Sequence, residues 1–352
     1  MQRNREFGAD LVRVVATFFI IGVHFFLYSD FYSVSQEEIL FVLAGFVRWI
    51  TFACVPLFLV LTGYLKGKAK WTPQYYRSLV PILVTWLLMS VIGIAFSIGY
   101  LHVEHTFGEW LVELFEYRAS KYAWYIELYI VLFLLAPFLN EVFRGQQNKS
   151  FHKGLLVTFF VVTILPSITN FYSVGDERLR ILPDYMVLLW PITYYYVGCY
   201  IAMYKPNPKK RNCIAVAVVA ALCQSVVTYI HSSGDSFDDL LKAGYADLFT
   251  FVITIAVFLM LYSVNTKKTK VRQVVTHISK RSLHIYLVSS IFDMLIWNDG
   301  AGMAVFDEYW WKFPVKCMGV FIAALLTSEI TYPISQAIAK LVLQLVSKEK
   351  SK

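Results

Sequence analysis

The sequence predicts an all-α, polytopic membrane protein with about ten transmembrane helices and with both termini in the cytoplasm. Composition is the first sign: 58% of the residues are hydrophobic, only 16% are charged, and the mean hydropathy is +0.56. Soluble domains carry about 25% charged residues, so this chain has too much apolar surface for a soluble core to hide. The second sign is a series of long apolar segments, and the third is the placement of positive charge between them.

Crossing a hydrocarbon core takes about 20 consecutive apolar residues in a helix. We expect ten such segments within a single membrane domain that spans residues 1–352, and the ninth is the shortest. Prolines inside them are tolerated, because neighbouring helices satisfy the freed backbone groups. The predicted segments are 11–28, 39–65, 79–100, 122–143, 155–173, 184–204, 212–230, 245–264, 282–297 and 313–334.

Lysine and arginine concentrate in alternate connections between these segments. The N-terminus, every second connection and the C-terminal tail hold 23 of the 32 basic residues, whereas the other connections hold seven. Cytoplasmic loops of membrane proteins carry this excess of positive charge, which orients both termini inward. The other connections carry acids instead, including Glu104, Glu109 and Glu113. Because the net charge of +8 follows this pattern, it predicts orientation in a lipid bilayer and no nucleic-acid partner.

The N-terminal residues predict no cleaved signal peptide, and the cysteines and histidines predict no disulfide or metal site. The first ten residues are polar and no small-residue cleavage site follows segment 11–28, so we expect it to stay as a membrane helix. None of the five cysteines forms a C-x-x-C pair and no H-E-x-x-H pattern occurs, so we expect no disulfide and no metal. In the outer loop 101–121, apolar residues at helical spacing predict a short interfacial helix.

The first segment carries charge where lipid is expected. Arg13 and His24 are eleven residues apart, which places them on one helix face about 16 Å from each other. Asp10, three residues before Arg13, lies within reach on that face. Arg13 could be a snorkelling anchor and His24 a polar residue satisfied within the bundle. A histidine in a dry cavity is also what a general base requires, so His24 and Arg13 are the candidate catalytic residues and Asp10 a supporting one.

Three other places carry polar groups in predicted helices. Arg48, in the second segment, could hold an anionic substrate or pair with an acid such as Glu127. Near the start of the fourth segment, Trp124 and Tyr125 beside Glu127 could stack on a sugar ring, or could form an aromatic belt at the membrane interface.

The third place is His284, which is followed nine residues later by Asp293 in the ninth segment. Nine residues put the two side chains on opposite faces of a helix, so we expect them not to be partners. We interpret His284 as structural.

Several stretches resemble the membrane acyltransferase-3 family. The sharpest is an arginine and a histidine separated by ten residues in the first helix, here Arg13 and His24. The stretches CVPLFLVLTGYL, YRSLVPILVTW, YAWYIELYIVLFLLAPFL, TYYYVGCYIA and ISKRSLHIYLVSS follow in the family's order. One departure concerns the histidine and proline that often follow Ile-Tyr-Leu in the family, where this chain has Val288, Ser289 and Ser290.

The resemblance implies a function and a location. Family members use a cytoplasmic acyl-coenzyme A, usually acetyl-CoA, to modify sugars at the outer face of the bacterial cytoplasmic membrane. It implies that Arg13 and Arg77 bind the donor and that a surface polysaccharide is the glycan acceptor. We see no fused outer hydrolase-like domain, so we expect transfer either to be direct or to be completed by a separate extracytoplasmic partner. An exporter or flippase of a surface polysaccharide is the alternative, because buried charges and broken helices also serve transport.

Overall fold

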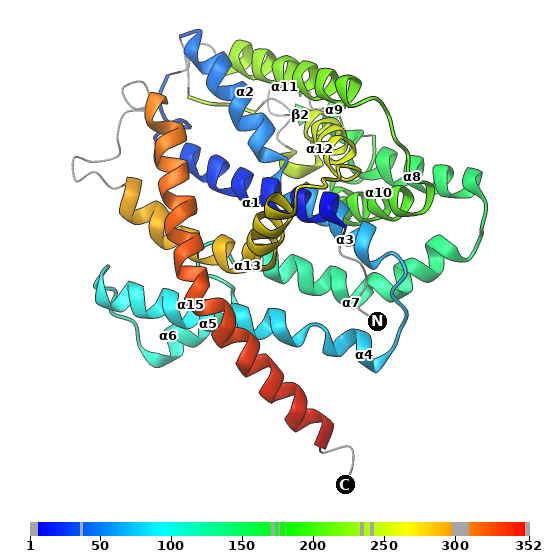
Figure 1. Ribbon diagram of the computed structural model, residues 1–352. Coiled ribbons are helices and arrows are strands. Elements are labelled where there is room, and N and C mark those ends of the chain that lie inside the picture. Colours follow the sequence, from blue (N-terminus) through cyan, green and yellow to red (C-terminus); the bar gives the residue numbers. More distant parts are fainter. Residues whose placement is uncertain are drawn as a thin grey trace.

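The computed structural model describes residues 6–35, 38–169, 173–174, 177–179, 181–232, 236–239, 243–297 and 310–348, and these form a bundle of helices (Figure 1). The strands within these ranges are two residues long, β1 (Ser173–Val174) and β2 (Glu177–Arg178), and pair antiparallel. The predicted all-α class is therefore confirmed. The helices not bounded below are α4 (Pro73–Arg77), α5 (Val80–Gly99), α6 (Phe107–Phe115), η2 (Gly244–Ala246) and η3 (Trp310–Lys312).

Eight helical stretches within these ranges are long and apolar enough to cross a membrane. They are Phe7–Tyr28, Leu40–Lys66, Pro73–Gly99, Trp124–Arg144, Lys149–Thr169, Asp184–Tyr204, Lys210–Ser232 and Trp310–Ser347. Two predicted segments fall short of this measure. The helix α12 (Leu248–Leu261) is apolar but has 14 residues, and the first half of α13 (Thr269–Trp297) is largely polar and basic. The count of ten crossings and the orientation of the termini stay predictions.

The predicted segment 39–65 corresponds to the apolar span Leu40–Lys66, but this span is not one continuous helix. The chain forms α2 (Leu40–Phe52) and α3 (Cys54–Lys66), which meet at a break at Ala53. Pro56 has no N–H to donate to the carbonyl of Phe52 four residues earlier, so the α-helical ladder is interrupted at this point. Pro56 instead occupies the first turn of α3, where the missing donor costs little.

Proline also sets other helix boundaries. Segment 155–173 forms α8 (Lys149–Thr163) and α9 (Pro166–Thr169), and residues 170–172 lie outside the described ranges. A 3₁₀ turn, η1 (Asp184–Leu189), precedes α10 (Trp190–Tyr204), whose second residue is Pro191. The other main helices follow the predicted segments more closely: α1 (Phe7–Tyr28), α7 (Trp124–Arg144) and α11 (Lys210–Ser232).

The helix α1 lies at the centre of the bundle and packs against α2, α3, α13 and α15 (Figure 1). Close backbone contacts hold its neighbours. A Cβ atom added to Gly63 of α3 would lie 1.9 Å from the carbonyl oxygen of Tyr195 of α10, and one on Gly198 would lie 2.0 Å from that of Val60. Only glycine permits this approach, so the Thr-Gly-Tyr and Val-Gly-Cys stretches of the sequence mark the α3–α10 contact.

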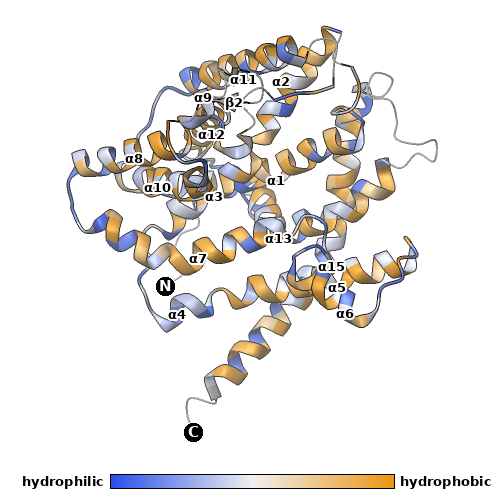
Figure 2. Cartoon of the chain, turned by 180° about the vertical axis from the view of Figure 1, so that it is seen from behind, coloured by the Kyte–Doolittle hydropathy of each residue, from blue (hydrophilic) through white to orange (hydrophobic). Residues whose placement is uncertain are grey.

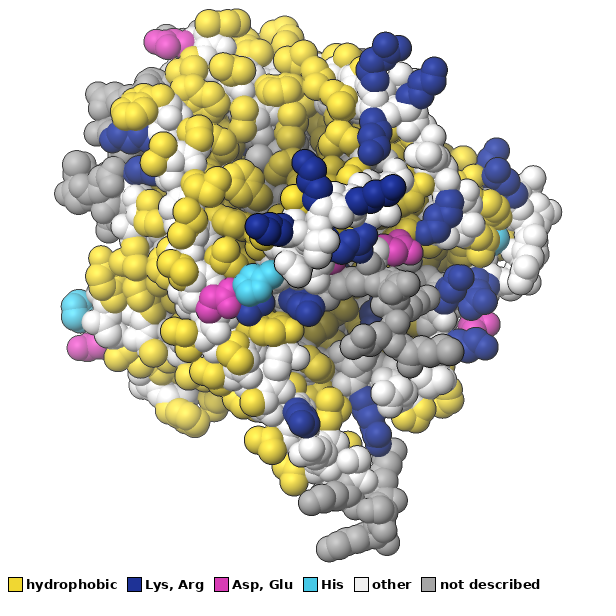
Figure 3. Space-filling view, in the orientation of Figure 1, with side chains coloured by type: hydrophobic (Ala, Val, Ile, Leu, Met, Phe, Trp, Pro, Cys, Tyr) yellow, Lys and Arg dark blue, Asp and Glu magenta, His cyan; other side chains and the backbone are white. Residues whose placement is uncertain are grey.

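The outside of the bundle is apolar. Figure 2 shows hydrophobic residues along the outer helices, and large exposed side chains occur on each of them, such as Val91 of α5, Phe138 of α7 and Val219 of α11. An apolar exterior of this extent fits lipid as the surrounding solvent. Figure 3 shows lysine and arginine side chains gathered on one face of the molecule.

The last helix, α15 (Phe313–Lys348), extends past the predicted segment 313–334 and past the body of the bundle (Figure 1). At 1.5 Å per residue its 36 residues span about 54 Å, well beyond a hydrocarbon core of about 30 Å. Its final turns therefore leave the core.

Candidate active site

A cavity of about 1110 Å³ opens among α1, α3, α5, α7, α10 and α13. We call it the first cavity. Its lining includes basic side chains from four connections far apart in the sequence: Lys66, Lys68, Arg144, Lys205 and Lys280. Each of these connections is one that the charge pattern assigns to the cytoplasm. The convergence of four such connections on one cavity agrees with that assignment and gives the cavity a positively charged mouth.

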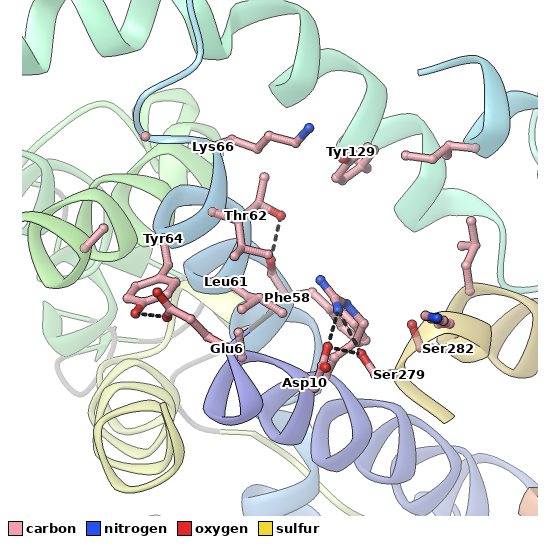
Figure 4. Close-up of a pocket in the computed structure, with 18 of the residues that line it drawn as sticks. Glu6, Asp10, Phe58, Leu61, Thr62, Tyr64, Lys66, Tyr129, Ser279 and Ser282 are labelled. Carbon is pink, nitrogen blue, oxygen red and sulfur yellow. Dashed lines mark hydrogen bonds and ion pairs between the residues drawn. The ribbon is translucent and has the colours of Figure 1, made fainter. Parts of the chain in front are cut away.

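Arg13 lines this cavity and is held there by hydrogen bonds between α1 and α13. Its Nη1 donates to Ser279 Oγ at 2.8 Å and lies 3.3 Å from Asp10 Oδ1. Ser279 Oγ donates in turn to Asp10 Oδ1 at 2.8 Å, and Thr276 Oγ1 donates to Oδ2 at 3.0 Å (Figure 4 shows Asp10 beside Ser279). The expected contact of Asp10 with Arg13 is thus present. The buried carboxylate orients a guanidinium whose side chain stays 23% exposed.

The rim of the cavity is tied together around Tyr64. The Tyr64 hydroxyl donates to Glu6 Oε2 at 2.5 Å, as Figure 4 shows, and the Lys205 ammonium lies 4.2 Å from the centre of the Tyr64 ring. Across the cavity Lys66 reaches from α3 toward Tyr129 of α7 (Figure 4). These contacts fix the start of α1 against α3 and keep cationic groups at the entrance.

His24 lies deeper along the same helix and is 8% exposed. Its Nδ1 is 3.3 Å from Oδ2 of Asp293 on α13, although the angle falls outside that of a hydrogen bond. The imidazole also stacks on the ring of Tyr122, with centroids 3.6 Å apart and 27° between the planes. Catalytic hydrogen bonds are often long or misaligned before substrate binds, so this contact is suited to tighten.

Asp293 is fully buried, and two donors position its carboxylate. Tyr122 Oη donates to Oδ2 at 2.8 Å, and Trp297 Nε1 donates to Oδ1 at 3.1 Å. Burying a carboxylate inside a membrane protein costs free energy. A buried acid that two donors hold in place is therefore a candidate functional residue. Sequence reasoning missed the contact of Asp293 with His24, since 269 residues separate the two. The available signal was an acid within an apolar segment.

The first cavity approaches this pair without reaching it. The last α1 residue that lines it is Ile20, one helical turn and about 6 Å before His24. Tyr125, Ile126 and Tyr286 also line the cavity. The cavity therefore runs along the face of α1 that carries Arg13 and ends beside His24.

The sequence matches the acyltransferase domain of family 3 over residues 7–329. This chain belongs to the acyltransferase-3 family. No curated protein and no solved structure matches it. The match includes α1 with Arg13 and His24, and it extends into α15. Together with the apolar helical architecture, it makes the protein a membrane acyltransferase.

Arg48 of this acyltransferase is 6% exposed and lies among aromatic rings. Its guanidinium carbon is 3.7 Å from the centre of the Trp49 ring and 4.3 Å from that of Phe52, and Nε donates to the Tyr32 hydroxyl at 3.2 Å. Within the described ranges it forms no ion pair, so the considered pairing with Glu127 is not formed. Cation–π contacts stabilise the charge instead.

The other predicted acceptor residues of the acyltransferase point apart. Trp124 is 42% exposed and stacks on Tyr245 at 5.9 Å, whereas Tyr125 is buried and lines the first cavity. Glu127 is exposed on α7. Arg77, predicted to bind the donor, is half-buried on α4 and does not line the first cavity. The structure thus does not bring these four residues into one site, and their roles stay predictions.

His284 and Asp293 are not partners, as the spacing predicted. His284 Nε2 lies 2.8 Å from Ser335 Oγ of α15. All five cysteines of the acyltransferase are free. In the part of the chain that the structure describes, no three or more His, Cys, Asp or Glu side chains are placed to hold a metal ion.

Proposed function

We propose that this membrane acyltransferase moves an acetyl or other short acyl group from cytoplasmic acyl-CoA to a hydroxyl of a cell-surface glycan, in the bacterial cytoplasmic membrane. One observation carries the proposal. A cavity with a basic mouth runs along α1 from Arg13 to within a turn of His24, whose imidazole lies against a buried carboxylate. That order matches a donor with an anionic head and a reactive thioester at the far end.

The donor's charge fits the mouth of the first cavity. The phosphates of CoA would face the basic side chains around the rim, and Arg13 would bind a group further in. The lining also contains apolar side chains, such as Phe58, Leu61 and Ile20, which suits an extended uncharged arm. The volume of about 1110 Å³ is slightly above the usual range of ligand pockets, about 300–1000 Å³, which leaves room for a large donor.

The chemistry needs one base near the thioester. His24 would remove the proton of the acceptor hydroxyl as its oxygen attacks the carbonyl carbon. The new C–O bond forms, the C–S bond breaks, and the leaving CoA thiolate takes the proton from the imidazolium. The carboxylate of Asp293 faces Nδ1 of His24, so Nε2 is the nitrogen that would act as the base. The same carboxylate would stabilise the imidazolium that forms. For donor and base to meet, the first cavity has to extend past Ile20 by one helical turn, about 6 Å.

The test is acetyl transfer from radiolabelled acetyl-CoA into cell-envelope glycan, using membranes with the wild-type protein or with His24→Ala at equal expression. We expect label in wild-type glycan and a loss of label in the variant. Glycan that crosses proteoliposomes without any acyl-CoA, and stays unlabelled when acetyl-CoA is added, would contradict the proposal and support the exporter or flippase.

A further inference from the structure

A second cavity of about 530 Å³ lies beside the outer loop that contains α6. Two helices contribute to both cavities with different halves. Residues 81, 82 and 85 of α5 and six residues of α13 from Ser279 to Tyr286 line the first cavity, whereas later residues of the same helices, such as Gly93 and Ser290, line the second. The two cavities share no lining residue. They therefore lie toward opposite ends of α5 and α13, and the second is at the end that the charge pattern assigns to the exterior.

The second cavity comes next to the candidate catalytic pair. Tyr122 lines it, and the same ring stacks on His24 at 3.6 Å and donates to Asp293. The first cavity stops at Ile20, on the other side of His24 along α1. His24 is thus approached from two directions, by a basic cavity through Ile20 and by the second cavity through Tyr122.

The second cavity has a different lining from the first. It presents the indole of Trp110, packed 4.6 Å from the imidazole of His105, together with the carboxylate of Glu113. His105 Nδ1 is buried without a hydrogen-bond partner and lies 4.0 Å from Glu113 Oε1. An aromatic face beside several donors and acceptors suits a sugar ring, which is apolar on its faces and carries hydroxyls at its edge. Further hydroxyl groups come from Ser97, Ser120 and Ser290.

The outer wall of this cavity is ordered in advance. Thr106 and Glu109 form a capping box at the start of α6, and the hydrogen bonds from the backbone N–H and the hydroxyl of Thr106 hold the pKa of Glu109 below its usual value. At the other end of α6 the ring of Tyr117 stacks on Trp86 at 4.8 Å. A wall fixed in this way reduces the entropy lost when a ligand binds.

We propose that the second cavity binds a sugar unit of the acceptor glycan. Trp110 stacks on the sugar ring, and Glu113 and His105 form hydrogen bonds with the sugar hydroxyls. The proposal rests on the proposed function, since it supplies that reaction with its second substrate. A hydroxyl that passes Tyr122 would meet His24 from the outer half of the bundle, while the thioester arrives from the inner half. It locates the acceptor away from Trp124, which the sequence favoured.

The decisive comparison is Trp110→Ala against Trp124→Ala, since both remove an indole from the outer part of the protein. Transfer of radiolabel is measured against increasing concentrations of envelope polysaccharide, extracted from cells that express the protein, at saturating acetyl-CoA. We expect kcat/KM for polysaccharide to fall about tenfold or more in Trp110→Ala and to change less than twofold in Trp124→Ala. The reverse pattern, or no effect of Trp110→Ala, would overturn the proposal.

Two further measurements separate a lost sugar contact from a lost fold or a wrong reaction. Binding of acetyl-CoA should be unchanged in Trp110→Ala, and Trp110→Phe should restore most of the activity. A wild-type protein that binds no acetyl-CoA would instead reject the proposed function.

Ser97→Cys tests the location of the second cavity. The introduced cysteine should react with a membrane-impermeant maleimide added from outside, and polysaccharide should slow that reaction. If neither free polysaccharide nor lipid-linked glycan slows the labelling of this cysteine, the assignment is contradicted. If only one of them slows it, that form is the one that binds.

Discussion

Three imidazoles are buried in the described part of the bundle, those of His24, His152 and His284, and the first and the last have different partners on or beside α13. His24 lies against the carboxylate of Asp293, whereas His284 Nε2 contacts the hydroxyl of Ser335, which itself donates to the carbonyl of Tyr332 at 3.0 Å. Since the Ser335 proton is used there, His284 Nε2 is the donor in its contact with Ser335. A carboxylate instead stabilises the charged imidazolium that a general base becomes. Burial alone therefore does not identify the base, and the partner does.

The largest expected effect separates the two histidines directly. His24→Ala should lower the rate of acyl transfer by about 10²- to 10⁴-fold, the usual contribution of a general base. His284→Ala removes the same ring from a similarly buried position that also lines the first cavity but has no carboxylate partner, so we expect a smaller loss, below tenfold. Rates are measured in membranes with equal amounts of inserted protein. Similar losses in both variants would mean that the carboxylate partner does not distinguish them.

The partner itself is tested by Asp293→Asn, which keeps the size of the side chain and removes its charge. We expect the rate to fall about 100-fold with little change in the KM for acyl-CoA. Loss of the carboxylate costs about 10⁴-fold in a Ser-His-Asp triad, and the looser contact here predicts less. Ser335→Ala, the matching change beside His284, should alter the rate less than threefold. A rate unchanged by Asp293→Asn would remove Asp293 from the account.

Arg13 and Arg77 sharpen the distinction between donor binding and chemistry. Arg13→Gln should raise the KM for acyl-CoA about tenfold, because a charge-assisted contact is lost, with a smaller effect on kcat. Arg77→Gln should change the KM less than threefold, since Arg77 does not line the first cavity. The measurement is the dependence of initial rate on acyl-CoA concentration. Equal effects of the two changes would place the donor outside the first cavity.

The smallest effect concerns the hydrogen bond of His284. Because the His284 ring packs between α13 and α15, His284→Gln should preserve a donor near Ser335 and retain activity within twofold. His284→Phe leaves the Ser335 oxygen without its donor. It should lower the free energy of unfolding by about 1–3 kcal/mol, the usual cost of a buried unsatisfied polar group. Thermal unfolding in detergent, followed beside activity, checks both. Activity lost without a change in stability would give His284 a role in the chemistry.

The sequence alone predicted what depends on local spacing. The face shared by Arg13 and His24, the reach of Asp10 and the opposite placement of His284 and Asp293 all follow from about 100° of rotation per residue. The break at Ala53 was missed, although Pro56 signalled it, because hydropathy runs through the break without interruption. Apolar residues at helical spacing in the loop 101–121 predicted a short helix, which the structure contains as α6.

Contacts between distant segments could not be predicted from spacing. The approach of Asp293 to His24 depends on how α13 packs against α1, and no local pattern in either helix specifies it. The same holds for the four basic connections that converge on one cavity. The sequence favoured one sugar-binding site of Trp124, Tyr125 and Glu127 because these residues are close in sequence. Successive residues of a helix point about 100° apart, so the three side chains face different directions.

The most direct test of the central claim is a double-mutant cycle on His24 and Asp293. Transfer rates are measured for the wild type, His24→Gln, Asp293→Asn and the double variant in matched membranes. If Asp293 acts through His24, the double variant should be no slower than His24→Gln alone, because the partner has nothing left to support. Rates that multiply independently would contradict a joint role and would separate the buried carboxylate from the acyl-transfer chemistry.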